Sequence, residues 1–404
     1  MQTKIAIILL LLVLTIGLLG YTAAQQACGS GLAEECVRSE LAMRDRTGLD
    51  VFNVETESSV FVGGQNGTWF KVGQYPRLYQ VSLQTDSFIQ LDPVLSGGTV
   101  WGGGFSGSQL LVSGWGTDDA SQGPYVWIYN GAQVVAKGSL DDFGQALSWN
   151  GGDVFAASYN GTEWLLSGLG SGTLSSFGTG PTNHMALGTF NGSVFTDLSG
   201  LIPEQQDAIL YANAWNGRYW LVGGGYMSAG VLFAYDGNRT VDLTAQIVDA
   251  VPSFASVQAL AWNGEYWLIG GIGFVAKYDG HSFVDLTQRL KGALKSDFRA
   301  VNAIAWNGKS WVIGGGTPIA QTIPSNAWLA SFDSADFVNL SSLLPSYVNT
   351  EASSILSITA ANGMWILGGY SGSHGILFAY EDGRLTDYSS LVRQFTYVDW
   401  VFAT

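Results

Sequence analysis

The chain has 404 residues, of which 47% are hydrophobic, 13% aromatic and only 12% charged, and 54 are glycine. Its net charge of −15 argues against nucleic acid as a partner, because binding to phosphates requires lysine and arginine. Glycine interleaved with aromatic and β-branched residues fits neither collagen nor disorder, and is typical of many short strands joined by tight turns.

Residues 1–24 predict an export signal or a membrane anchor. Lys4 precedes the apolar run Ile5–Tyr21, which is long for the core of a signal peptide and short for a transmembrane helix. The small residues Thr22–Ala24 fit a signal-peptidase site before Gln25. Both alternatives stay open. Both predict an extracytoplasmic chain that is secreted or anchored at the cell surface.

Residues 25–50 are expected to form a short stalk. Leu32–Met43 has a helical pattern, and the only cysteines of the chain, Cys28 and Cys36, lie close together in this segment. In an exported protein such a pair favours a disulfide. No metal site is expected, because two thiols without a nearby histidine are a poor ligand set.

An internal repeat fills residues 51–404. Its clearest copies are Ala212–Gly224, Ala259–Gly271 and Ala303–Gly315, each with Trp-Asn-Gly, a second tryptophan and Gly-Gly. The Asn-Gly or Ser-Gly turns that mark successive units are 40 to 56 residues apart, at Asn66, Ser106, Asn160, Asn216, Asn263, Asn307 and Asn362. Seven marks predict seven units.

Each unit is interpreted as four antiparallel strands. Leu260–Trp262 and Tyr266–Ile269 alternate with the period of two that places side chains on opposite faces. Asn-Gly between them predicts a two-residue hairpin turn, and Tyr-Asp-Gly predicts a second hairpin. We therefore expect an all-β fold, a seven-bladed β-propeller of four-stranded antiparallel blades, preceded by an N-terminal apolar helix and the stalk. Phe395–Phe402 is expected to close the ring by pairing near Val51–Val62.

The repeat resembles the kelch family, in which a glycine pair ends the second strand and an aromatic residue precedes an Asp-type turn. Gly63-Gly64 is out of register, and the tryptophan that the family has in the fourth strand is replaced by Phe283, Phe337 or Val241. The resemblance implies the propeller fold more than any subfamily. It rests on Gly223-Gly224, Gly270-Gly271, Gly314-Gly315, Gly368-Gly369 and on Tyr235, Tyr278, Phe332 and Tyr380.

Two repeated features are assigned to the scaffold. The tryptophans of the second strand, including Trp220, are expected in the core, because every unit has the same packing to solve. The aspartates after the fourth strand, including Asp242, are expected in turns and caps. Five Asn-X-Ser/Thr sequons would accept glycans in an exported protein, at Asn66, Asn160, Asn191, Asn238 and Asn339.

Recognition is expected where the repeat is irregular. The loops that join the second strand to the third, and one blade to the next, vary in length and share one face of a propeller. We therefore predict a binding surface for a protein or a glycan of the cell envelope. Its candidate residues are Tyr75, Trp115, Asp118, Asp119, Tyr226, Met227, Phe274, Tyr370 and His374.

The sequence favours a non-enzymatic binding or structural module, with no catalytic residue, cofactor or metal assigned. The alternative is a secreted carbohydrate-active enzyme using acidic residues of the variable-loop face, because glycoside hydrolysis needs two suitably spaced carboxylates. Galactose-oxidase chemistry is disfavoured, since the chain has three histidines and both cysteines precede the ring. The acids available to an enzyme are Asp118, Asp119, Glu204, Asp207, Asp249, Asp297 and Glu351.

Overall fold

The structure, a computed structural model, describes residues 59–65, 77–82, 87–90, 97–106, 109–117, 122–129, 134–139, 149, 152–170, 184–202, 208–226, 229–318, 325–349, 352–361, 364–392 and 397–403. For residues before 101, and for 115–117, 122–123, 134–139, 349, 361 and 397–403, it describes the backbone alone. The chain divides into the units Met1–Asn53 and Val54–Thr404. The predicted leader, the stalk, Cys28 and Cys36 all lie outside the described residues.

The described strands form antiparallel sheets in which successive strands pair. In sheet order, the first three are β28 (Tyr397–Ala403), β1 (Ser59–Gln65), β2 (Arg77–Ser82), β3 (Ser87–Gln90); β4 (Gly97–Phe105), β5 (Leu110–Thr117), β6 (Gln122–Tyr129), β7 (Val134–Ser139); and β8 (Asp153–Tyr159), β9 (Trp164–Gly170), β10 (His184–Phe190), β11 (Phe195–Asp197). The next two are β12 (Ile209–Trp215), β13 (Trp220–Tyr226), β14 (Ala229–Tyr235), β15 (Thr240–Asp242); and β16 (Val257–Trp262), β17 (Trp267–Gly271), β18 (Phe274–Tyr278), β19 (Phe283–Asp285).

The remaining strands form one sheet made of two four-stranded meanders. Only the pairing of Gly316 with Ser354 joins them. The meanders are β20 (Ala300–Trp306), β21 (Trp311–Gly316), β22 (Trp328–Phe332), β23 (Phe337–Asn339), and β24 (Ser353–Ala361), β25 (Met364–Ser371), β26 (His374–Glu381), β27 (Arg384–Asp387).

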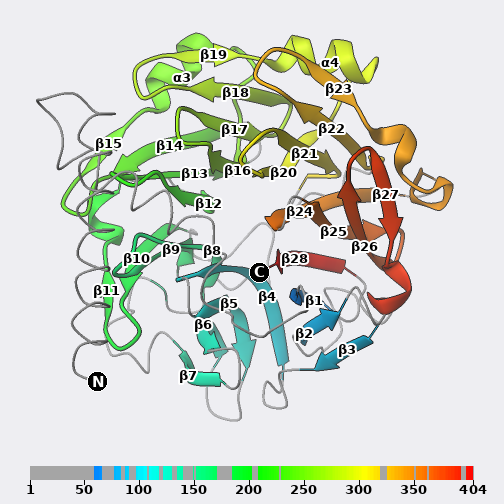
Figure 1. Cartoon of the computed structure of the whole chain (residues 1–404). Coiled ribbons are helices and arrows are strands. Elements are labelled where there is room, and N and C mark those ends of the chain that lie inside the picture. The colour runs from blue at the N-terminus through cyan, green and yellow to red at the C-terminus, as the bar shows by residue number, and fades with distance from the viewer. Residues whose placement is uncertain are drawn as a thin grey trace, which may run out of the picture. The chain divides into compact units, whose positions relative to one another are not determined.

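The first strands of the sheets form a closed inner ring. Strands β4, β8, β12, β16, β20 and β24 contact one another in this order, and β28 contacts both β24 and β4 (Figure 1). The C-terminal strand thus joins β1 and completes the N-terminal sheet, as the sequence predicts. A ring of four-stranded antiparallel sheets is a β-propeller, and the strand pairing confirms that fold class.

The core lies between neighbouring sheets. Leu221 and Leu232 of one sheet pack with Trp267 and Ile269 of the next. The tryptophans at the start of five second strands, first or second in the strand, are at most 6% exposed, which confirms their assignment to the core: Trp164, Trp220, Trp267, Trp311 and Trp365. Such burial between sheets is what a single sheet cannot provide for itself.

The two glycines of each pair have different roles. A Cβ on the first glycine would meet the next sheet: at Gly223 it would lie 2.6 Å from Val257, and at Gly270 it would lie 2.4 Å from Val301. A Cβ on the second would meet the first strand of its own sheet: at Gly224 it would lie 1.9 Å from the carbonyl oxygen of Ile209. The first glycine therefore leaves room for a side chain of the next sheet, and the second lets the backbones of the first and second strands approach closely.

The glycine pair of β1 corrects one sequence interpretation. Gly63 pairs with Trp400 and Gly64 with Val398, and the register shifts between them as it does beside the other pairs. Gly63-Gly64 is therefore in register with the repeat, and the earlier assignment is wrong. The error came from Asn66, which follows β1 and so does not mark a turn between a first and a second strand.

A three-residue motif ends the fourth strands. In Asp242-Leu243-Thr244, the Thr244 backbone N–H donates to Asp242 Oδ1 at 2.8 Å, and the Thr244 hydroxyl bonds the N–H and the carbonyl oxygen of Leu232 in the third strand. The same bonds start at Asp197, Asp285, Asn339 and Asp387. A helical turn then begins at the Ser or Thr: η3 (Ser199–Leu201), α3 (Thr244–Ala250), α4 (Thr287–Leu294), η4 (Ser341–Leu343) and η6 (Ser389–Val392), while η5 (Ser346–Asn349) follows η4. This confirms the scaffold role predicted for the repeated aspartates.

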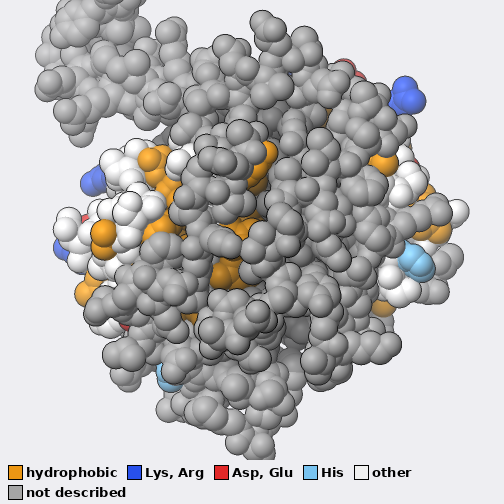
Figure 2. All heavy atoms as spheres, turned by 90° about the horizontal axis from the view of Figure 1, so that it is seen from below, with side chains coloured by type: hydrophobic (Ala, Val, Ile, Leu, Met, Phe, Trp, Pro, Cys, Tyr) orange, Lys and Arg blue, Asp and Glu red, His pale blue; other side chains and the backbone are white. Residues whose placement is uncertain are grey.

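The described surface is sparsely charged. On the face seen in Figure 2, the Lys and Arg side chains of the described residues that are visible lie as separate spots rather than as a patch. Their ion pairs lie at the surface, with Lys291 partly buried, and join Arg239 to Asp236, Arg289 to Asp336 and Lys291 to Asp297. No described helix has the length and apolar character that crossing a bilayer requires.

The glycine geometry gives a stability test. Gly224→Ala is expected to destabilise the fold by roughly 1–3 kcal/mol or more, because the new methyl group would overlap the Ile209 carbonyl. Gly292→Ala in α4 is the matched control: a Cβ there meets nothing, and alanine favours a helix by about 0.5–1 kcal/mol. Urea unfolding of both variants measures the difference. Equal midpoints would show that the β13 backbone can move away.

Candidate functional site

The propeller has two unlike ends. At one, which we call the hairpin end, short turns join the first strand to the second and the third to the fourth, and those after Trp215 and Tyr235 have four residues. At the other, the variable-loop end, the second strand turns into the third and each sheet connects to the next. The first strands begin at the variable-loop end, so Asp153 and Ile209 lie there and Trp215 lies near the hairpin end.

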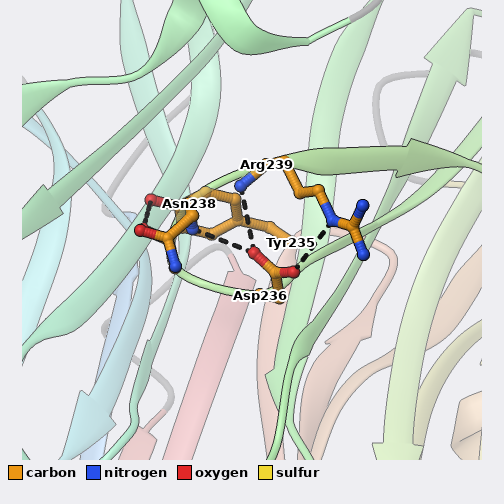
Figure 3. Close-up of polar contacts among 5 residues, drawn as sticks. Tyr235, Asp236, Asn238 and Arg239 are labelled. Carbon is orange, nitrogen blue, oxygen red and sulfur yellow. Dashed lines mark hydrogen bonds and ion pairs between the residues drawn. The ribbon is translucent and has the colours of Figure 1, made fainter.

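The turns of the hairpin end are built by asparagine and aspartate side chains. Figure 3 shows one of them: the backbone N–H groups of Asn238 and Arg239 both donate to Asp236 Oδ1 at 3.0 Å, and the Tyr235 hydroxyl donates to the Gly237 carbonyl. These bonds, from Asn238 first, hold the pKa of Asp236 below its usual value. The Asn-Gly turns repeat the pattern through Asn160, Asn191, Asn216, Asn263 and Asn307.

This geometry corrects the predicted turn type. In the Asn216 turn only Gly217 has a positive φ, 94°, and the loop spans four residues between Trp215 and Trp220. Asparagine is therefore present for its side-chain acceptor rather than for a left-handed backbone. At the hairpin end, a two-residue turn of the predicted type is described between Glu381 and Arg384, where both central residues have positive φ.

A β-bulge in each first strand lies close to the variable-loop end. The register shifts leave one residue of the first strand without a partner directly opposite it. These bulge residues are Trp101, Phe155, Tyr211, Gln258, Asn302, Leu356 and, in β28, Asp399.

Three of the bulge residues form an aromatic cluster across three sheets, which we call the axial aromatic cluster. The ring centroids of Trp101 and Phe155 are 5.1 Å apart, and those of Phe155 and Tyr211 are 5.3 Å apart in an edge-to-face arrangement. Phe155 is buried, whereas Trp101 and Tyr211 are partly exposed. The cluster packs with Leu169 and Ile209 and is separate from the cores between the sheets.

A fully buried carboxyl adjoins the cluster. The Trp101 indole Nε1–H donates to Asp153 Oδ1 at 3.2 Å, whereas Asp153 Oδ2 has no partner among the described residues. Burial raises the pKa of Asp153 to about 7, and the bond from Trp101 opposes that shift. A carboxyl whose protonation changes near neutral pH, at the end where the loops vary, is a candidate functional group.

The facing bulge residues are polar. Asn302 is 3% exposed, and its Nδ2 donates to the Thr317 carbonyl at 2.8 Å and to Ser354 Oγ at 2.7 Å. Its Oδ1 is buried without a partner in the described part of the chain. Gln258 is 4% exposed. The inner ring thus has an aromatic arc and an amide-bearing arc at the same level of the first strands.

The predicted surface residues have different outcomes. Tyr226 is the last residue of β13, at the variable-loop end, and is 39% exposed. Burial raises the pKa of the Tyr211 hydroxyl, and the nearby Tyr226 raises it further. Tyr370 is partly exposed, and His374 is exposed at the start of β26. The side chain of Trp115, and the residues Tyr75, Asp118, Asp119 and Met227, lie outside the described residues.

The inclusion of Phe274 in the recognition surface is wrong. Its side chain is fully buried and packs against Phe254 with ring centroids 5.2 Å apart. The predicted loop is short here, because Phe274 already pairs with Gly271 in the β17–β18 ladder. The side chain fills the space above that glycine instead of reaching solvent.

Trp101, Asp153, Phe155 and Tyr211 are not among the site residues predicted from the sequence. A signal for the three aromatics was present: each lies five residues before the Asn or Ser that starts the first turn, at a position that holds Gln258 and Asn302 in two other units. The residue that follows is small, Gly102, Ala156 or Ala212. Variation at one position within a constant pattern marks a side chain that the scaffold does not specify.

The sequons differ in their surroundings. Asn191, Asn238 and Asn339 are exposed and Asn160 is partly so, whereas Asn66 lies outside the described residues. Asn339 Nδ2 donates to the Leu294 carbonyl at 3.4 Å. No group of three or more His, Cys, Asp or Glu side chains that could hold a metal ion occurs among the described residues.

Comparison with known proteins gives likenesses in structure alone. No family model and no curated protein matches the sequence. The β-propeller domain of the Trilobed protease from Pyrococcus furiosus is similar over 72% of this chain and 84% of its own, with 9% identity and a TM-score of 0.41. Sqt1 from Chaetomium thermophilum, bound to the N-terminus of the ribosomal protein L10, is similar over 82% and 87%, with 14% identity and a TM-score of 0.45.

An acylaminoacyl peptidase from Pyrococcus horikoshii is similar over 82% of this chain, with 11% identity and a TM-score of 0.43. The match spans 53% of the peptidase, about half its length. All three TM-scores are below 0.5, so the propeller assignment rests on the strand pairing of the chain itself.

The Asp153 carboxyl predicts a pH dependence of stability. Its pKa rises from 3.8 unfolded to about 7 folded, so the folded chain binds the proton more tightly. The stability that this contributes is fully present below about pH 4 and is lost as the pH rises to about 7, by up to about 4 kcal/mol. Asp153→Asn keeps an acceptor for Trp101 and should remove this loss.

Urea unfolding between pH 4 and pH 8 measures the effect as the difference between wild type and variant. The control, Asp249→Asn, removes an exposed carboxylate with the same change in net charge. The wild type should lose stability relative to Asp153→Asn as the pH rises, and Asp249→Asn should follow the wild type. Parallel profiles for all three proteins would show that Asp153 is ionised in the fold at little cost.

Proposed function

We propose that the chain is an exported, non-enzymatic recognition module, a seven-bladed propeller of kelch-like type that binds a partner at its variable-loop end. The bulge residues carry the proposal. The bulge recurs from sheet to sheet, yet its residue is aromatic, polar or aliphatic in different sheets. Every sheet has the same packing requirements at its bulge, so the scaffold does not explain why the residue differs. Such variety is expected where the side chains bind a ligand.

Three observations support the finer parts of the proposal. The five four-stranded sheets and the two meanders of the eight-stranded sheet favour seven blades. The glycine pairs, with their contacts to the next sheet and to the bulge, favour a kelch-like repeat. The apolar run Ile5–Tyr21 favours export, either as a secreted chain or as one anchored at the cell surface.

A protein of the cell envelope is the proposed partner. Aromatic side chains and methionine are enriched at the centres of protein interfaces, and Tyr226 presents an aromatic ring beside the axial aromatic cluster. The carbohydrate-active enzyme has less support, because hydrolysis uses a pair of carboxylates. No second carboxylate of the described residues contributes to the pKa of Asp153.

The proposal predicts that binding and stability separate on mutation. Replacing Tyr226 and Met227 together with serine should weaken retention on native cell envelopes and leave thermal unfolding nearly unchanged, because Tyr226 is 39% exposed. Trp220→Ala should instead cost roughly 3–5 kcal/mol of stability, as the truncation of a buried aromatic residue.

Retention of purified protein on envelopes and thermal unfolding are measured on the same samples. Early unfolding of the Tyr226/Met227 variant would assign the loop to the core. Normal retention of a stable variant would place the recognition surface elsewhere.

A further inference from the structure

The Asp153 carboxyl is not required by the repeat. The equivalent position, two residues before the bulge, holds Ile209, Ser256, Ala300 and Ser354 in other first strands. All of these side chains are uncharged, and the same bulge forms beside each of them. The fold therefore accommodates a neutral residue at this position, and the carboxyl of β8 needs another explanation.

Among the described residues, none supplies Asp153 with a compensating charge. The one bond described for its carboxyl comes from the neutral Trp101 indole, and no described lysine, arginine or histidine contributes to its pKa. A buried carboxylate without a cation is unfavourable, and a donor that reaches Oδ2 would stabilise it. The donor that would stabilise the carboxylate most is a positively charged nitrogen.

The neighbouring surface fits the carbon part of such a cation. Trp101 and Tyr211, both partly exposed, flank the buried ring of Phe155. Aromatic faces attract ammonium and guanidinium groups, tryptophan most strongly, and they also pack against alkyl stems. The net charge of the whole chain, −15, attracts cationic ligands as well.

We infer that Asp153 and the axial aromatic cluster bind an organic cation, an ammonium or guanidinium group on an apolar stem. The nitrogen donates to Asp153 Oδ2, and the stem packs on Trp101, Phe155 and Tyr211. The inference rests on the proposed recognition at this end of the propeller, and it names the chemistry that the partner must present. A lysine or arginine side chain of a protein and a free amine share that chemistry.

The first experiment titrates the full chain with n-butylammonium and n-butylguanidinium, with n-butanol as the uncharged match, by calorimetry. The cations should bind and the alcohol should not. Asp153→Asn should weaken binding at least tenfold, whereas Glu265→Gln, which removes an exposed carboxylate with the same change in net charge, should leave it unchanged. Tyr211→Leu should weaken binding by roughly 5- to 30-fold and Tyr211→Phe should retain it, because the ring supplies the attraction.

A second readout follows the indole N–H of Trp101 by NMR, assigned from its absence in Trp101→Phe. Its resonance should shift when a cation binds, because this N–H shares the Asp153 carboxyl with the ligand. The shift should be absent in Asp153→Asn. Binding of neutral sugars or of n-butanol instead, or equal binding of cations by Asp153→Asn, would overturn the inference.

The source of the cation is tested by competition. A short peptide with one lysine or arginine is compared with the same peptide carrying norleucine or citrulline, each displacing n-butylammonium. Displacement by the charged peptides alone assigns a protein side chain, and displacement by free amines alone assigns a small molecule.

If no cation binds while retention on envelopes still depends on Tyr226 and Met227, the cation site is wrong and the proposed function stands. If cations bind but the Tyr226/Met227 variant is retained normally, the recognition surface fails and the cation site stands.

Discussion

The contact between a second-strand glycine and a first-strand carbonyl determines how each sheet meets the axis of the propeller. A Cβ would lie 1.9 Å from the carbonyl oxygen at Gly168, Gly224 and Gly315, and 2.0 Å from it at Gly369. Each of these glycines pairs with the residue just before the bulge. The close approach leaves room for one extra residue in the first strand. That residue leaves the ladder, so it has no fixed partner within its own sheet.

The other repeated contacts make this arrangement rigid. The Asp-Leu-Thr motif ties the fourth strand to the third through the Thr244 hydroxyl, and the same contact recurs at Ser199, Thr287, Ser341 and Ser389. Asn and Asp side chains close the turns of the hairpin end. Since β28 contacts both β24 and β4, the ring has no open edge along its inner strands. Residues at the bulges are therefore held by a scaffold that does not depend on their identity.

The parts of the fold that recur could be predicted from sequence, and those that occur once could not. The predictions for Trp220 and Asp242 are correct because a packing or turn-forming requirement that the sheets share leaves a periodic signal. The first unit was misread because its first strand lies at the other end of the chain, in β28, so no turn before Gly63 marks it. Phe274 was misplaced because the turn between β17 and β18 is too short to carry its side chain outward.

The axial aromatic cluster was missed for a related reason. Alternation assigns the residues of a strand to two faces, whereas a bulge adds one residue and breaks that alternation. Trp101, Phe155 and Tyr211 therefore look like ordinary first-strand residues until the register shows which residue has no partner. Asp153 looks like one more acid in an acidic chain, and only its burial and its contact with Trp101 distinguish it.

The burial of Asp153 also separates function from stability in this fold. A carboxyl whose pKa is raised to about 7 by burial destabilises the folded chain whenever it is ionised. The other first strands show that serine, alanine or isoleucine can take its place in the same backbone. A costly side chain at a position where cheaper ones fit is expected to persist only where it does something else. Its neighbours are the aromatic bulge residues, which have no partner in the ladder. The destabilising carboxyl and the bulge residues that differ between sheets therefore lie together, at the variable-loop end of the inner ring.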